Sequence, residues 1–481
     1  MKINKSWYRD KLYACWLGKN IGGTLGAPYE GTKSTLDIKG YKTKPGQPIP
    51  NDDLDLQLLW LYVLEREGAK NLNQNMLAEY WIDWIPPNWN EYGIAKANLR
   101  KGLLPPLSGE IENKRWQTSN GAWIRSEIWA AMAPFFGDIA MKYAAMDAMV
   151  DHGISEGTYA EMFTAAMQSA AYYESDIRKL IDIALAKIPY DSRIARAVRL
   201  VIECYEQGVP YLEVRERLVQ QSADIGMFQA PANIGFVVIG LLYGEGDFKK
   251  SLIYTINCGD DTDCTGATVG ATLGIIGGTQ GIPDDWREYV GDRIVMVALN
   301  GQGTYHLPQS CTELTDRIIA VMPSLLAVNG INIELVDEET EFDEALFKRF
   351  NSQSASEIVN VGKYSYEIQN YKPLWARVDL LDSPRIAPME KRQVKVQLFN
   401  RFHNAKRLKL ELFLPKGWKG TLSQKSVMLE MMLNHNTLHP GPTVTLEIEA
   451  GEEVDDVNFA YLQVSGQLFV QPVMIPIVFV G

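Results

Sequence analysis

The chain has 481 residues, 46% of them hydrophobic and 22% charged, which is typical of a globular protein with two or three domains. Its formal net charge of −12 argues against nucleic acid as a partner, because neutralising phosphates requires patches of Lys and Arg. The same balance favours the binding of cations. Five widely spaced cysteines with no CxxC pair argue against a disulfide framework or a zinc ribbon.

The N-terminal segment MKINKSWYRDKLYACWLGKN has neither the apolar core nor the small-residue cleavage site of a signal peptide. The most apolar stretches are broken by Gly, Asn or Asp well short of the ~18–20 residues that a bilayer-spanning helix needs. We therefore expect a cytoplasmic protein without a membrane partner.

The first acidic motif of the chain is PNDDLDLQLLWLYVLE, residues 50–65. Pro50 and Asn51 precede an amphipathic pattern, so Asp52 and Asp53 are expected at the N-terminus of a helix. One carboxylate is enough for a helix cap, whereas three lie here within four positions, and like charges this close cost energy unless a cation neutralises them. The motif therefore indicates a metal ligand set.

The middle of the chain is expected to be helical. Residues 160–188 place apolar side chains three and four apart, and residues 233–246 form an apolar run that ends at Gly, as a buried helix does. The pattern extends over residues 1–327, which we predict to be an all-α domain.

The second acidic motif is NCGDDTDCTGATVGATLG, residues 257–274. Asp260, Asp261 and Asp263 again stand before a helix. Residues 265–283 are rich in Gly, Ala and Thr, which would let this helix approach its neighbours closely. Oxygen ligands at two helix N-termini suit Mg²⁺ or Mn²⁺, and a zinc site is disfavoured because four of the five histidines lie beyond residue 300. Two such motifs in one domain predict a shared metal site.

The composition and periodicity of the sequence change after the helical region. Residues 328–372 contain an acidic, polar stretch and are expected to be a linker with one short helix. Residues 373–481 alternate polar and apolar positions in five clear runs, 394–400, 408–415, 443–450, 459–466 and 473–480. Period-two runs separated by Pro, Gly and Asn predict an all-β immunoglobulin-like sandwich.

Six segments in matching order resemble the ADP-ribosylglycohydrolase family, whose best-known member reactivates dinitrogenase reductase. Besides the two acidic motifs they are LGKNIGGTLGAPYEG (17–31), SNGAWIR (119–125), DHGISEGTYAEMFTAA (151–166) and LLYGEGDFKKSL (241–252). A single motif would be weak, but six in order over residues 8–320 are a specific signal. The resemblance implies an all-helical domain that holds two Mg²⁺ ions, with Mn²⁺ as an alternative, and that cleaves an N- or O-ribosyl bond of ADP-ribosylated substrates.

The resemblance also implies roles for individual residues. Catalysis is expected of Glu30, Asp53 and Asp261, and substrate binding of Asn120, Gly121 and His152. The expected metal ligands are Asn51, Asp52, Asp53, Asp261, Asp263 and Thr265.

The chain departs from the family pattern at three positions. Asn51 stands where the family has Thr or Ser, Cys264 where it has Thr, and Gly23 where Asp is common. A thiol is a poor ligand for Mg²⁺, and Thr265 is shifted by about 100° around the helix. These departures leave open whether the site holds one ion or two.

Two alternatives follow from these departures and from the C-terminal module. In the first alternative, the substrate of the hydrolase is another glycoside or nucleoside, since β-rich modules often accompany carbohydrate-active enzymes. In the second alternative, the chain is a catalytically silent ADP-ribose-binding or structural protein, similar to the crystallin-like members of the family.

Overall fold

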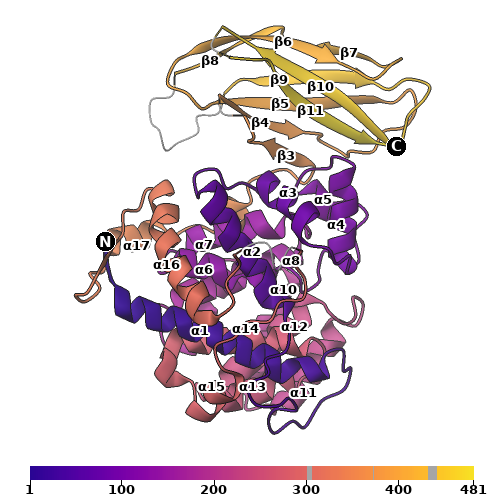
Figure 1. The fold of residues 1–481 in the computed structure, drawn as a ribbon. Helices are drawn as coiled ribbons and strands as arrows, with labels where there is room; N and C mark the ends of the chain where they lie inside the picture. Colours follow the sequence, from indigo (N-terminus) through magenta and orange to yellow (C-terminus); the bar gives the residue numbers. More distant parts are fainter. Residues whose placement is uncertain (301–305, 372, 432–440, 468) are drawn as a thin grey trace.

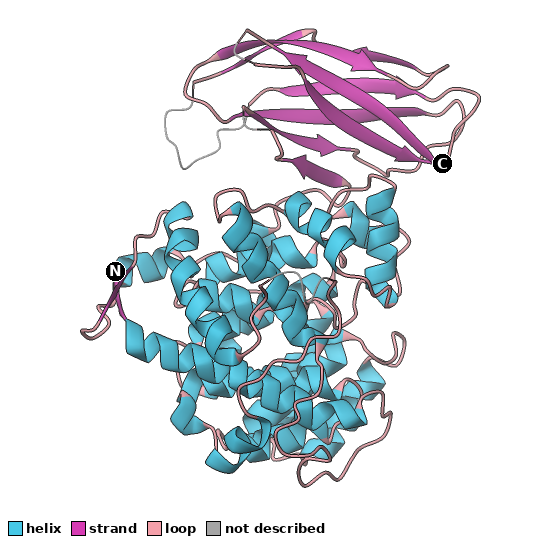
Figure 2. Ribbon diagram, in the orientation of Figure 1, coloured by secondary structure: helices cyan, strands magenta, loops and turns pink. Residues whose placement is uncertain are grey.

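A computed structural model describes residues 1–300, 306–371, 373–431, 441–467 and 469–481. Helices and strands are segregated along the chain: helices fill the N-terminal two thirds, and two β-sheets form the C-terminal part, which lies against one end of the helical part (Figures 1 and 2). Each part has its own core of buried apolar side chains. The expected fold class, an all-α domain followed by a β-sandwich, is confirmed.

The helices before residue 330 are α1 (Lys5–Gly26), α2 (Asp52–Glu67), α3 (Gln74–Trp84), α4 (Asn90–Arg100), α5 (Leu107–Glu110), α6 (Glu127–Met132), α7 (Gly137–Ala148), α8 (Glu156–Ala170), α9 (Ile177–Leu185), α10 (Arg193–Glu206), α11 (Tyr211–Gln221), α12 (Ala230–Gly244), α13 (Phe248–Ile256), α14 (Thr262–Gly277), α15 (Asp284–Val290) and α16 (Cys311–Val328). Short 3₁₀ helices span Ala27–Tyr29, Trp123–Arg125 and Thr279–Gly281. The apolar periodicity of residues 160–188 divides between α8 and α9, because Asp176 caps a new helix by accepting from the amides of Arg178 and Lys179.

Helices α1 and α14 lie side by side at the centre of the helical part (Figure 1). Glycines make this approach possible, because a Cβ built on Gly22 would stand 2.0 Å from the carbonyl oxygen of Gly266, and one on Gly18 would stand 2.1 Å from that of Gly270. The tight helix packing expected for residues 265–283 is confirmed. It brings the C-terminus of α1 beside the N-terminus of α14, which positions the acidic motifs.

Residues 328–372 pack against both parts of the chain. Strand β2 (Glu334–Val336) pairs in parallel with β1 (Lys2–Asn4), and the short helices α17 (Glu344–Arg349) and α18 (Ala355–Ile358) follow. Asp138 of α7 accepts from the amides of Ser352 and Gln353, so this segment is fastened to the helical part. The domain boundaries at 327 and 372 stay a prediction.

The C-terminal part consists of two antiparallel sheets. One sheet has the order β11 (Val473–Val480), β10 (Val457–Ser465), β6 (Lys406–Phe413) and β8 (Ser426–Leu429). The other has the order β3 (Ser365–Ile368), β4 (Leu374–Asp379), β5 (Lys391–Asn400), β9 (Thr443–Glu449) and β7 (Lys419–Leu422). Alternate residues of the strands are buried in a common core, which is the pattern of a sandwich.

The sandwich contacts the helical part next to helices α3, α4 and α5 (Figure 1). Leu103 and Leu107 belong to the core of the sandwich, and the Asn75 side-chain amide donates to the carbonyl of Glu367 at 2.7 Å. Among the described residues, no helix combines the length and the apolarity needed to cross a membrane.

Candidate metal centre and substrate loop

The first acidic motif lies at the N-terminus of α2, as the sequence predicts. Asn51 is the N-cap, and its Oδ1 accepts from the amide of Asp53 at 2.8 Å. Asp52 is half-buried and Asp53 is fully buried. The third carboxylate of the motif, Asp55, is occupied elsewhere, because its Oδ2 accepts from the amides of Val297 and Ala298.

The second acidic motif is held against the end of the first helix by backbone pairing. Asp260 donates its amide to the carbonyl of Thr32 at 2.7 Å and accepts the amide of Gly31 at 2.8 Å. This bridge brings Glu30 beside the start of α14, where Asp261 is the N-cap and Asp263 lies in the first turn. Asp260, which stands in the motif but was not among the expected metal ligands, thus anchors the loop.

Potential metal-ligand side chains from the two motifs and from the N-terminal segment that ends at Gly31 lie around Asp263. Glu30, Asp261 and Asp263 form one group in which the potential ligand atoms lie within 4.8 Å of one another, and Asp53, Asp263 and Cys264 form a second such group. The structure therefore brings four of the predicted residues into one cluster. Asp52 belongs to the same acidic region, since its carboxylate interacts electrostatically with Asp263 and Glu30.

The electrostatics of the cluster favour a cation. Burial, reinforced by Asp263, raises the pKa of Asp261 well above its usual range, and burial together with Asp263 raises the pKa of Asp52 to about 8. The side chain of Glu30 reaches the surface, but its carboxylate is partly desolvated, and together with the nearby Asp263 this raises its pKa to about 7. Carboxylates that are this costly to ionise together are stabilised by a divalent cation.

Two buried oxygen atoms provide a further test of fit. Asp53 Oδ2 and Asp263 Oδ1 accept no hydrogen bond from the part of the chain that the structure describes. A buried acceptor left unsatisfied costs free energy, and a hard cation satisfies such oxygens. Asp263 Oδ1 belongs to the Glu30–Asp261–Asp263 group, so this group fits Mg²⁺ or Mn²⁺, whereas Asp53 Oδ2 lies 3.7 Å from the ammonium of Lys19.

A buried lysine stands next to this cluster. Lys19 Nζ, in the middle of α1, lies 3.1 Å from Glu127 Oε2 and 3.7 Å from Asp53 Oδ2, and it donates to the carbonyl of Ile124 at 2.7 Å. Burial opposes its charge, but attraction to Glu127 and Asp53 outweighs burial and raises the pKa of Lys19. The sequence analysis missed Lys19 and Glu127, because their partnership spans 108 positions and no local pattern marks it.

The predicted substrate loop contacts the cluster directly. The side-chain amide of Asn120 donates to Asp261 Oδ2 at 2.7 Å, and Asn120 Oδ1 accepts from Trp123 Nε1 at 3.1 Å. Gly121 is required by a close approach, since a Cβ there would stand 2.1 Å from Glu91 Oε1. Asn120 is thus held in one orientation between the loop and the acidic cluster.

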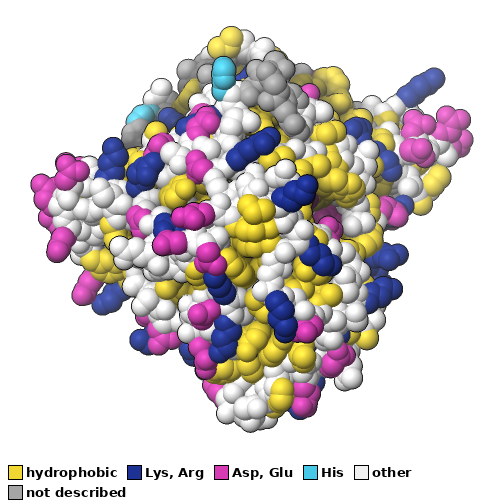
Figure 3. All heavy atoms as spheres, turned by 60° about the horizontal axis from the view of Figure 1, so that its bottom comes forward, with side chains coloured by type: hydrophobic (Ala, Val, Ile, Leu, Met, Phe, Trp, Pro, Cys, Tyr) yellow, Lys and Arg dark blue, Asp and Glu magenta, His cyan; other side chains and the backbone are white. Residues whose placement is uncertain are grey.

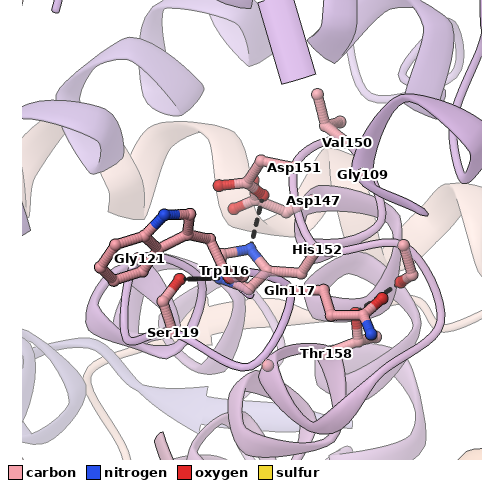
Figure 4. Close-up of polar contacts among 12 residues, drawn as sticks. Gly109, Trp116, Gln117, Ser119, Gly121, Asp147, Val150, Asp151, His152 and Thr158 are labelled. Carbon is pink, nitrogen blue, oxygen red and sulfur yellow. Dashed lines mark hydrogen bonds and ion pairs between the residues drawn. The ribbon is translucent and has the colours of Figure 1, made fainter. Parts of the chain in front are cut away.

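His152 lies behind this loop and is fully buried. Figure 4 shows its ring between Ser119 and Asp151: Nε2 is 3.1 Å from Ser119 Oγ and Nδ1 is 3.0 Å from Asp151 Oδ1. Arg125 donates to Asp151 and also to the carbonyl of Gly121. These contacts fasten the loop, and direct contact of His152 with substrate stays a prediction.

Three residues beside the predicted carboxylates, Thr265, Cys264 and Asn51, make different contacts. The Thr265 hydroxyl donates to the carbonyl of Asp261 at 2.9 Å within its own helix, and its role as a metal ligand stays a prediction. Cys264 is the side chain that faces the first motif, with Sγ 3.3 Å from Asp53 Oδ1. Asn51 uses its oxygen for capping, which leaves its Nδ2 without a hydrogen-bond partner among the described residues.

The sequence model of the ADP-ribosylglycohydrolase family matches residues 4–323. The chain belongs to the ADP-ribosylglycohydrolase family. The match includes every candidate residue described above and ends within α16, the last long helix of the helical part.

Individual relatives of the ADP-ribosylglycohydrolase region are distant. An uncharacterised protein of Archaeoglobus fulgidus is 23% identical over 324 residues, which cover 64% of this chain and 99% of the relative. A solved structure described as an ADP-ribosylglycohydrolase-related protein complex is 20% identical, covers 66% of this chain and 99% of its own, and has a TM-score of 0.45. A second solved structure, the FixG-related protein from Vibrio parahaemolyticus, is similar to this chain with 10% identity, 23% of this chain and 97% of that one covered, and a TM-score of 0.18.

Proposed function

We propose that this member of the family is a metal-dependent glycohydrolase that cleaves the N- or O-ribosyl bond of ADP-ribosylated substrates. The observation that carries the proposal is the convergence of Glu30, Asp261 and Asp263, with two further aspartates of α2, at two helix N-termini. Family membership supports the general activity. The substrate, the bond and the metal are the parts proposed.

A divalent cation bound at these carboxylates would polarise ribose hydroxyls and lower the pKa of a bound water. Glu30 takes the proton from the attacking water, because its side chain is the most exposed of the carboxylates in this cluster and can be reached by that water. The surrounding aspartates stabilise the oxocarbenium character of the sugar through their negative charge. Asn120 orients Asp261 and presents the loop to the substrate.

On the face of the molecule shown in Figure 3, Lys and Arg side chains are interspersed with Asp and Glu. Such a mixed surface gives no steering towards a polyanion over that face.

The test compares Asp261→Asn with Asp284→Asn. Both residues lie at the start of a helix, but Asp284 opens α15 with its side chain 78% exposed. We expect Asp261→Asn to abolish both cation binding and turnover of ADP-ribosyl-arginine, ADP-ribosyl-serine or O-acetyl-ADP-ribose, whereas Asp284→Asn retains both. Turnover by Asp261→Asn in the presence of a chelator would refute the proposal.

The same panel addresses the alternatives. Turnover of simple ribosides but of no ADP-ribosylated compound would favour a hydrolase of other glycosides. The capping role of Asn51 and the thiol of Cys264 favour a silent ADP-ribose-binding protein as the second candidate. Calorimetry that detects ADP-ribose binding, together with an absence of turnover for the whole panel, would select it.

A further inference from the structure

The buried ammonium of Lys19 occupies one side of the acidic cluster. Its Nζ lies 3.1 Å from Glu127 Oε2 and 3.7 Å from Asp53 Oδ2, and neither partner is exposed to solvent. Glu127 is fixed in turn by the side-chain amides of Gln57 and Gln168, each at 3.0 Å. A charge this deeply buried persists only when it is paired and hydrogen-bonded. Lys19 is therefore a built-in cation of the site.

The two donor groups around Asp263 differ in chemistry. The group on the Glu30 side contains only carboxylates, whereas the group on the Asp53 side contains the thiol of Cys264. Hard divalent cations favour oxygen ligands over sulfur. The group with the poorer ligand is also the one beside Lys19.

Asn51 removes a further oxygen from the Asp53 side. Its Oδ1 accepts a hydrogen bond from the amide of Asp53. Its Nδ2, which is a donor, lies so close to Gly23 that a Cβ built there would stand 2.0 Å from it. The amide group thus fills the space left by the glycine and turns a donor towards α1. Three departures of this chain, at positions 23, 51 and 264, act together on one side of the cluster.

We propose that the centre holds one divalent cation, on the Glu30–Asp261–Asp263 side, and that the ammonium of Lys19 supplies the positive charge on the Asp53 side. This inference rests on the proposed function, since it concerns the same site. A second divalent cation at Asp53 would lie close to the ammonium of Lys19, and the two positive charges would repel each other. The charge of Asp53 is then balanced by the ion pair of its Oδ2 with Lys19, and its Oδ1 accepts from the Cys264 thiol, in place of a bond to a metal ion.

The experiment counts Mn²⁺ on the full chain after chelator treatment and dialysis. We expect one Mn²⁺ per chain and the six-line electron paramagnetic resonance spectrum of an isolated Mn²⁺ ion. Cys264→Thr, which restores an oxygen but keeps the ammonium, should still bind one. The double variant Lys19→Met with Cys264→Thr should bind two and give the broadened spectrum of coupled ions.

A matched control is Lys96→Met. Lys96 is also buried, but it donates to backbone carbonyls, including that of Ile85 at 2.7 Å, away from the acidic cluster. This variant should bind one Mn²⁺. Two ions on the wild-type chain or on Cys264→Thr would overturn the proposal, and so would a single ion on the double variant. If the double variant does not fold, the counts on the wild-type chain and on Cys264→Thr decide.

Failure of this inference is distinguishable from failure of the proposed function. Two Mn²⁺ ions on a wild-type chain that turns over substrate would overturn the single-ion proposal alone. One ion on a chain that hydrolyses nothing in the panel would support the single-ion proposal and contradict the hydrolase. A chain that binds no Mn²⁺ would contradict both.

Discussion

Gly22→Ala tests whether the contact between α1 and α14 positions the acidic cluster. The added Cβ would stand 2.0 Å from the Gly266 carbonyl oxygen and 2.3 Å from its carbon, both of them backbone atoms that no rotamer change can move away. Restoring an ordinary contact requires the two helices to separate by about 1.4 Å, given a closest comfortable distance of 3.4 Å. Overpacking of a buried contact costs about 1–3 kcal/mol, and here the backbone origin of the clash places the cost at the upper end, about 3 kcal/mol.

The same displacement acts on the site. Asp261 and Asp263 move with α14, while Glu30 follows the C-terminus of α1, so the separation widens the group that would hold the cation. A misplacement of about 1 Å in a catalytic constellation lowers the rate about 100-fold. We therefore expect Gly22→Ala to unfold at lower denaturant and to lose most of its Mn²⁺ affinity and turnover.

The measurements are urea denaturation, calorimetry with Mn²⁺ and steady-state kinetics. The control is Gly277→Ala at the C-terminal end of α14, the other helix of the pair, because Gly277 is exposed and a Cβ there meets nothing within 4 Å. That substitution should be neutral or stabilise the chain by about 0.5–1 kcal/mol through helix propensity. If Gly22→Ala matched the control in stability and Mn²⁺ affinity, the role assigned to the glycine contact would be refuted.

Three further predictions concern buried groups near the site. Arg125→Met leaves the carboxylates of Asp147 and Asp151 buried without their partner, so urea denaturation should show that the free energy of unfolding falls by about 3–5 kcal/mol. The control, Arg9→Met, removes the exposed ion pair with Asp316 and should lower it by only about 0–1 kcal/mol. Equal losses for the two variants would contradict this. Burial alone would raise the pKa of Asp151, but Arg125 and His152 outweigh it and hold the pKa at about 2. Because that pKa is depressed, ionised Asp151 stabilises the chain above pH 4, and this stabilisation is lost as the pH falls towards 2. The stability advantage of the wild-type chain over Asp151→Asn should therefore shrink by about 2 kcal/mol across that interval, and a constant difference would contradict the assignment. All five cysteines are buried, so a thiol reagent should modify none in the folded chain and five in urea, and labelling of Cys264 before unfolding would show that it is accessible.

The elements that carry a local pattern could be predicted from the sequence. The run of Gly, Ala and Thr forms helix α14, and α2 begins at Asp52 immediately after its Asn cap. The five alternating runs of the C-terminal region became β5, β6, β9, β10 and β11. In each case the determining interaction lies within a few residues, either a cap or the burial of every second side chain.

Interactions between distant segments could not be predicted in this way. Strands β1 and β2 pair across more than 330 positions and are three residues long, too short for a period to be visible. The bridge between Thr32 and Asp260 depends on backbone atoms rather than on side-chain types. Both features are consequences of tertiary packing, which overrides local propensity.

The position of Lys19 in the acidic cluster could not be predicted from local sequence either. In the sequence it stands in a glycine-rich stretch where a lysine reads as a surface residue, because Lys is almost never fully buried unless it is paired. Its burial follows from the close packing of α1, which leaves the side chain no path to solvent and directs it to Glu127 and Asp53. The three departures at Gly23, Asn51 and Cys264 read separately as losses of metal ligands. Together with a buried ammonium they form a consistent alternative, in which the protein itself supplies the charge that a second metal ion would otherwise bring.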